Sequence, residues 1–158
     1  MTTQADASDA LDMVRSAPAE PDTSTYNAFV AALHLTGIDL IKIQGERMVS
    51  GAASQTRFDL AVGYMLGDGA IQYRYDLMAH FLDDAGISLG NASASVLLLT
   101  SNVPSTDVAC IEHFGATSGA LMVHPYLREV IGSTAQRIGF FGVLLPMIKH
   151  QPRGSVTD

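Results

Sequence analysis

The sequence predicts an α+β domain in which a four-stranded antiparallel sheet is followed by a long helix packed on one face of the sheet. Between residues 31 and 103, four stretches place apolar side chains at the two-residue spacing of strands. After residue 125 the spacing changes to the three or four residues of an amphipathic helix. This order of strands first and helix last is typical of an α+β fold.

The chain is expected to form one domain between two flexible ends. Residues 1–25 are rich in Ala, Ser, Thr, Asp and Pro, and Pro18 and Pro21 interrupt any helix, which predicts a disordered acidic arm. The domain then covers residues 26–149, and residues 150–158 form a flexible tail. A chain of 158 residues is long enough to bury one core without a disulfide or a metal.

The first predicted strand covers residues 31–48. Its apolar residues alternate, but the phase of the alternation slips near Gly37 and again at Leu40 and Ile41. A one-residue slip sends the following side chains to the other face of a sheet unless the strand contains a bulge. The pattern therefore predicts a long, bulged strand.

The second and third predicted strands form a hairpin. One face of the second strand carries Phe58, Leu60, Val62, Tyr64 and Leu66. Gly67, Asp68 and Gly69 predict a tight turn, after which residues 71–81 return with the same alternation. A fourth strand is expected over residues 94–103, and its run of Val96 to Leu99 predicts burial on both faces or contact with a partner.

Two helices are expected after the strands. Ser105 and Thr106 are candidate N-caps for a first helix, which ends near Phe114 because Gly115 and Gly119 interrupt it. Pro125 then opens a longer helix at its first turn. That helix packs through an apolar stripe and ends at Gly139; the stripe comprises Leu127, Val130, Ile131, Thr134, Ala135 and Ile138.

The composition restricts the classes of partner. A net charge of -7 repels a phosphate backbone, so nucleic acid is not an expected partner. Only 16% of residues are charged while 47% are hydrophobic, which leaves apolar surface to bury in a subunit interface or to present to a partner. A single cysteine, the lack of a signal-peptide pattern and the lack of a membrane-spanning stretch predict a cytoplasmic protein that does not insert into membranes.

The search for catalytic motifs predicts that the protein is not an enzyme and has no cofactor or metal. Phosphate-binding glycine motifs and a nucleophile elbow are absent. Cys110 and His113 are three residues apart, but no further ligand completes a site, so a core cysteine and a surface histidine are the simpler interpretation. His34 and His80 lie on strands that neighbour each other in one arrangement of the sheet, which alone is weak evidence for a metal.

Two alternatives stay open. In the first, a small-ligand or enzyme domain encloses an apolar cavity between a curved sheet and the helix, with Asp59 or Asp76 as a general base. The simpler interpretation of these two carboxylates and of Asp39 is a solvated strand face. In the second alternative the protein is an assembly scaffold, and all of its apolar surface is subunit interface.

The segment from His113 to Phe140 resembles the C-terminal signature of the SecB-type chaperones. That signature is a Pro-Tyr-x-Arg-Glu box that opens a long helix, followed by an Arg and a Gly-Phe segment. The box here consists of Pro125, Tyr126, Arg128 and Glu129, followed by Arg137, Gly139 and Phe140. The order of four strands and a helix is also similar to this family, so the resemblance covers residues 31–148.

The resemblance implies an ATP-independent chaperone that binds unfolded polypeptides in exposed apolar grooves, keeping them soluble and competent for export or assembly. The box residues and Arg137 would lie on a helix that packs subunits together, as a homotetramer built from two dimers. Clients would be preproteins or an antitoxin. After Phe140 the chain departs from the family pattern, and the second C-terminal helix of proteobacterial members is expected to be missing. This leaves coupling to the SecA export motor open, and it makes the resemblance closer to solitary members, which include toxin-antitoxin-associated ones.

The candidate client-binding residues are apolar side chains left over after the helix covers one sheet face. The same side chains could equally be core or subunit interface, because most apolar strand residues are. The candidates are Leu33, Leu35, Leu40, Phe58, Leu60, Val62, Leu144 and Met147.

Overall fold

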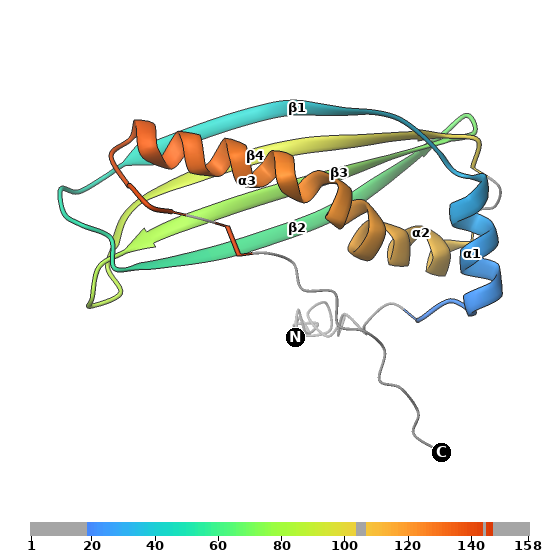
Figure 1. Ribbon diagram of the computed structural model, residues 1–158, viewed down its shortest axis with the longest axis horizontal. Coiled ribbons are helices and arrows are strands. Elements are labelled where there is room, and N and C mark those ends of the chain that lie inside the picture. The colour runs from blue at the N-terminus through green and yellow to red at the C-terminus, as the bar shows by residue number, and fades with distance from the viewer. Residues whose placement is uncertain (1–18, 104–106, 144, 147–158) are drawn as a thin grey trace, which may run out of the picture.

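The computed structural model describes residues 19–103, 107–143 and 145–146. Leu144, Met147, the expected tail and most of the expected arm lie outside these residues. The elements follow in the order α1 (Thr23–Ala32), β1 (His34–Arg47), β2 (Gln55–Gly67), β3 (Ala70–Leu82), β4 (Ser88–Ser101), α2 (Val108–Phe114), η1 (Gly115–Gly119) and α3 (Ala120–Arg137). Figure 1 shows the helices α2 and α3 on one face of the sheet, which confirms the predicted α+β class.

The four strands are antiparallel and lie in the order β1-β4-β3-β2, so β1 and β2 are the two edges. The apolar side chains of β3 and β4 that share the helix-bearing face are buried; Tyr75 and Val96, for example, are paired and fully buried. We call this side of the sheet the helix face and the other side the open face. The core lies between the two central strands and α3.

β1 has the two bulges that the sequence predicts. Its pairing with β4 shifts register between Leu35 and Gly37 and again between Leu40 and Lys42. These shifts return the apolar side chains to the helix face, where Leu35, Leu40 and Ile43 lie opposite helix-face residues of β4. The predicted hairpin turn is also present, and Gly69 has the positive φ, 70°, that such a turn requires.

The helix α1 was not predicted, and the expected strand start at residue 31 is wrong because Ala31 and Ala32 end this helix. The expected arm also extended to residue 25, two residues past the start of α1. Asp22 is the N-cap, and its carboxylate accepts hydrogen bonds from the backbone N–H groups of Ser24 and Thr25, both at 3.1 Å. The bond from the Ser24 hydroxyl, together with these backbone bonds, lowers the pKa of Asp22.

β4 begins at Ser88 rather than at residue 94. The additional residues include Ala92, which is fully buried but too small to mark a strand by its own hydrophobicity. Val96 and Leu98 are buried on the helix face, whereas Leu97 and Leu99 are half-buried on the open face. Burial on both faces is therefore incomplete within one chain, and the alternative of contact with a partner stays a prediction.

Gly115 and Gly119 do not interrupt the helical segment, and Pro125 does not begin a helix. The chain passes from α2 through the π-helical turn η1 into α3, and Pro125 lies within α3. The N-cap of α2 is Asp107, whose side chain accepts from Ala109 N at 2.9 Å; Ser105 and Thr106 fall outside the described residues. The glycines are required because β3 approaches the helix so closely that a Cβ on Gly119 would overlap the Tyr75 hydroxyl.

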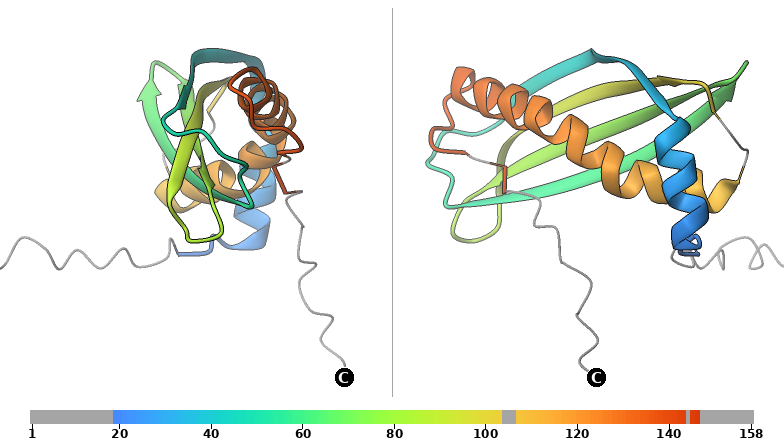
Figure 2. Two further views of the ribbon diagram at one scale, coloured as in Figure 1. Left: turned by 90° about the vertical axis from the view of Figure 1, so that its left-hand side faces the viewer. Right: turned by 45° about the vertical axis from the view of Figure 1, so that its right-hand side comes forward.

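α3 crosses the helix face diagonally (Figures 1 and 2). Its start follows η1, where Gly115 lies against Tyr73 and Val62, and its end lies over Gly45 of β1. The predicted apolar stripe packs on the sheet, with Leu127, Ile131 and Ala135 buried, and Gly139 follows the helix with a φ of 90°. Within the described residues, no helix has the length and apolar character needed to cross a bilayer.

Candidate functional site

Exposed apolar side chains lie on the helix face at both edges of the sheet. Because α3 runs diagonally, neither edge strand is fully covered by it. On β1 the exposed residues are Leu35, Leu40 and Ile43. On β2 they are Leu60, Val62, Tyr64 and Leu66. All of these face the same side of the sheet as the core, so the apolar surface continues from the core to solvent.

The structure divides the predicted client-binding residues into two groups. Leu33 and Phe58 are half-buried against the core, so they contribute to the fold. The other four described candidates are exposed; they are Leu35, Leu40, Leu60 and Val62. The first two lie on one edge strand and the last two on the other, so a single chain does not bring them together.

Sequence reasoning missed several exposed apolar residues. Tyr64 and Leu66 continue the alternation of β2, but nothing in that pattern shows that α3 leaves them uncovered. On α3, Leu121, Met122 and Tyr126 point away from the packed stripe, and Tyr126 is 51% exposed. Phe141 is 75% exposed just after the helix. Its neighbour Phe140 belongs to the Gly-Phe segment of the family signature, and this was the sequence signal that could have identified Phe141.

A cleft of about 440 Å³ lies between the β1–β2 linker and the turn that follows α3. One wall is made of small residues, and the other is the glycine-rich turn with its two phenylalanines. The lining residues are Ala52, Ala53, Ser54, Thr56, Gly139, Phe140, Phe141, Gly142 and Val143. Phe140 is buried and stacks on Phe81, with 4.4 Å between the ring centroids. None of these lining residues has an ionisable side chain, so the cleft lacks the means for acid-base chemistry.

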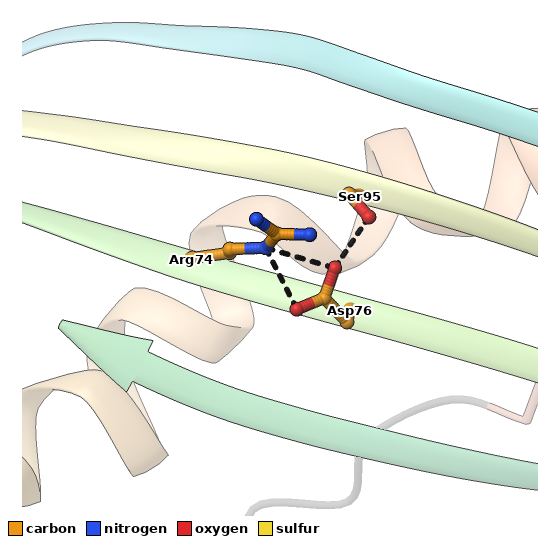
Figure 3. A network of polar contacts seen from close by, with 3 residues as sticks. All are labelled: Arg74, Asp76 and Ser95. Atoms are coloured by element: carbon orange, nitrogen blue, oxygen red, sulfur yellow. Dashed lines mark hydrogen bonds and ion pairs between the residues drawn. The ribbon is translucent and has the colours of Figure 1, made fainter.

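The two candidate bases lie on the open face, away from this cleft. Asp76 accepts two hydrogen bonds from Arg74 Nε, at 2.8 and 3.0 Å, and another from the Ser95 hydroxyl (Figure 3). Partial burial opposes ionisation of Asp76, but the bonds from Arg74 and Ser95 outweigh it and lower the pKa of the carboxyl. A carboxylate held ionised with both oxygens engaged is a poor general base.

Asp59 is likewise paired, with His80 Nε2 at 3.1 Å and Arg57 Nε at 3.5 Å. The hypothesis of a carboxylate within an enclosed cavity therefore has no support among the described residues. His34 and His80 are not neighbours either, since they pair with Ser101 and Asn91 near opposite ends of β4.

Cys110 and His113 do not form a reactive pair. Cys110 is fully buried, and burial together with the nearby Asp107 raises the pKa of its thiol. His113 packs edge-on against Tyr26, with 4.7 Å between the ring centroids. In the part of the chain that the structure describes, no three His, Cys, Asp or Glu side chains gather into a metal site.

The residues of the Pro-Tyr-x-Arg-Glu box lie within the first two-thirds of α3. Pro125, Tyr126 and Glu129 are exposed and Arg128 is half-buried, while Arg137 is exposed at the last residue of the helix. The exposed side of α3 is therefore available to a second molecule.

Comparison with known proteins supports the fold. No family model matches the chain, and no curated protein matches it by sequence. Among solved structures, it is similar to a SecB-like chaperone from Mycobacterium tuberculosis, in complex with a ChAD peptide from the HigA1 antitoxin. The TM-score is 0.65 with 18% identity, covering 81% of this chain and 99% of the other. The chain thus has the SecB-like fold that its sequence resemblance implied.

Proposed function

We propose that this protein is an ATP-independent molecular chaperone that binds unfolded polypeptides through exposed apolar surface. The observation that carries the proposal is the row of uncovered apolar side chains on the helix face of β2. A folded protein that leaves this much apolar surface accessible is suited to bind apolar segments of other chains. The solved structure with the same fold is a chaperone bound to an antitoxin peptide, which supports a polypeptide as the ligand class.

The geometry suits an extended client. Leu60, Val62, Tyr64 and Leu66 lie at alternate positions of a strand, the same spacing at which one face of an extended peptide presents its side chains. β2 is an edge strand, so its outer backbone groups are free of pairing with another described strand and could bond to the client backbone. Apolar contacts and backbone bonds depend little on client sequence, which makes binding tolerant.

The acidic charge of the chain favours clients with basic stretches, and it would help to keep the complex soluble. Preproteins and an antitoxin are the two client classes that this proposal includes, and SecA is the partner that export of a preprotein would involve. The proposal places the protein in the cytoplasm, where it needs neither a cofactor nor catalysis.

The proposed assembly is a homotetramer built from two dimers. Tyr126, Leu121 and Met122 on the exposed side of α3 are large apolar groups of the kind that subunit interfaces bury. The helix box therefore has an assembly role in this proposal, whereas the β2 surface has a client-binding role.

The test is suppression of aggregation. The purified protein is mixed with an equal amount of a chemically denatured client in the absence of nucleotide, and light scattering reports both aggregation and the size of the chaperone. Suppression by a tetramer is the expected result. A folded tetramer that leaves aggregation unchanged would instead favour the assembly scaffold, in which all the apolar surface is subunit interface.

A further inference from the structure

Arg47, the last residue of β1, makes hydrogen bonds to both sides of the cleft. Its Nη2 donates to the carbonyl oxygen of Gly51 at 2.8 Å, in the linker that forms one wall. Its Nη1 donates to the carbonyl oxygens of Ile138 at 3.2 Å and Gly139 at 3.0 Å, where the other wall begins. A single planar guanidinium thus connects two segments that lie about ninety residues apart in the chain.

The same side chain also contacts the cleft lining. The Arg47 guanidinium carbon lies 4.6 Å from the centroid of the Phe140 ring, and that ring stacks on Phe81 of β3. Phe140 is therefore held between a cation and a second aromatic ring. Its rotation would change the shape of the cleft, and both contacts oppose that rotation.

The position of the charge is also favourable. The carbonyls of Ile138 and Gly139 follow α3, where the helix dipole places partial negative charge and where helical carbonyls lack intrahelical partners. The positive φ of Gly139 turns the chain there, and a Cβ at this position would meet Arg47 Nη1. Glycine at position 139 therefore leaves the room that the Arg47 guanidinium needs.

We infer that Arg47 is the positioning residue of the cleft: by binding both walls it holds the cleft open at the size that receives a client side chain. This inference rests on the proposed chaperone function. Loss of the guanidinium removes the hydrogen bonds by which Arg47 joins the linker to the turn, so each client would have to order these two segments on binding. Arg47 therefore raises the affinity for the client by holding the two walls in place before the client binds.

The inference is tested on the full-length chain with Arg47→Gln and Arg47→Lys. The probe is reduced, carboxymethylated α-lactalbumin, which stays unfolded without denaturant. We expect Arg47→Gln to weaken probe binding by about tenfold, since charge-assisted bonds to two walls are lost. Lysine keeps the charge but lacks the planar fork, so Arg47→Lys should lie between Arg47→Gln and the parent. Amide exchange should accelerate in residues 50–56 and 139–143 and stay unchanged in β3 and β4.

The matched control is Arg57→Gln, which removes one positive charge from an exposed ion pair on the open face and should leave affinity and exchange at the cleft unchanged. If folded Arg47→Gln binds the probe as tightly as the parent, the inference is wrong. If Arg47→Gln does not fold, the test rests on Arg47→Lys. Parental affinity of Arg47→Lys for the probe, together with faster amide exchange at the cleft walls, would overturn the inference. If the parent itself does not bind the probe, the chaperone proposal fails. Amide exchange at the cleft walls of the variants then still shows whether Arg47 holds the two walls together.

Discussion

Tyr75 of β3 donates its hydroxyl proton to the carbonyl oxygen of Gly115 across 2.8 Å, within the buried core. Two residues earlier on the same strand face, the Tyr73 hydroxyl donates to the carbonyl of Ile111 at 3.0 Å. Burial raises the pKa of both phenols well above the usual value, so both stay protonated donors. The Tyr73 bond joins the sheet to α2, and the Tyr75 bond joins it to the first residue of the π-helical turn. Together they set the starting point of α3, which decides which strand residues the helix leaves uncovered.

The first prediction concerns this close approach. Gly119→Ala should lower the free energy of unfolding by about 2 kcal/mol or more, because the new methyl group would overlap the Tyr75 hydroxyl in a packed core. Denaturant unfolding followed by circular dichroism measures it. Gly63→Ala is the control, since nothing lies within 4 Å of a Cβ there, and it should change stability by less than about 0.5 kcal/mol. Equal effects of the two substitutions would contradict the packing described here.

The second prediction concerns the client surface. Leu60→Asp should strongly reduce suppression of client aggregation while the chain stays folded and assembled, because Leu60 is 46% exposed on the helix face of β2. Met65→Asp is the matched control, since it places the same charge on the same strand but on the open face, where Met65 is 63% exposed. If Leu60→Asp unfolds the protein, Leu60 belongs to the core. If both variants weaken capture equally, the helix face has no special role.

The third prediction concerns the cleft. Ala52→Trp should fill part of the volume between the linker and the turn, and it should weaken binding of an unfolded client several-fold without changing the oligomer. Fluorescence anisotropy of a labelled unfolded client gives the affinity. Ala61→Trp adds the same side chain on the open face of β2 and should leave affinity unchanged. Undiminished binding by a folded Ala52→Trp variant would show that clients do not use the cleft.

The fourth prediction concerns acid stability. The pKa of Asp76 is lowered in the folded chain from a reference value of 3.8, so the carboxylate stabilises the fold above about pH 4, and this contribution is lost as pH falls through the folded pKa. Asp76→Asn should therefore be less stable than the parent near neutral pH, and the difference should shrink below about pH 4. Urea midpoints measured across this range check it. A difference that grows on acidification would have the wrong sign.

Periodic apolar patterns predicted the elements whose buried side chains recur at regular spacing and pack against one neighbouring element. The alternation from Ile71 to Phe81 marks the buried face of β3, and the phase slip at Leu40 marks a true bulge. These signals are local, because each depends only on which sheet face a side chain takes. The stripe on α3 was predictable for the same reason.

The features that were missed depend on residues far apart in the chain. The local sequence predicts that Gly115 and Gly119 break the helix, because the tyrosines that need these glycines are about forty residues earlier. The helix α1 was hidden in a segment whose composition resembles a disordered arm, although Asp22 is an ordinary N-cap. The cleft carries no motif, since small linker residues and a glycine turn acquire their role only through Arg47. Phe58 packs against the core whereas Leu60, two residues later on the same sheet face, is exposed, a difference that alternation does not encode.

The last prediction concerns assembly. Tyr126→Asp places a charge on the exposed side of α3, where the side chain has no part in the buried stripe, so the monomer fold should be retained. If this side of α3 packs subunits together, burying an unpaired carboxylate there costs several kcal/mol and should convert tetramers to smaller species. Light scattering at several protein concentrations measures the change. A Tyr126→Asp variant that keeps the parental mass would place the subunit interface elsewhere, and the exposed β1 strand would then be the next surface to test.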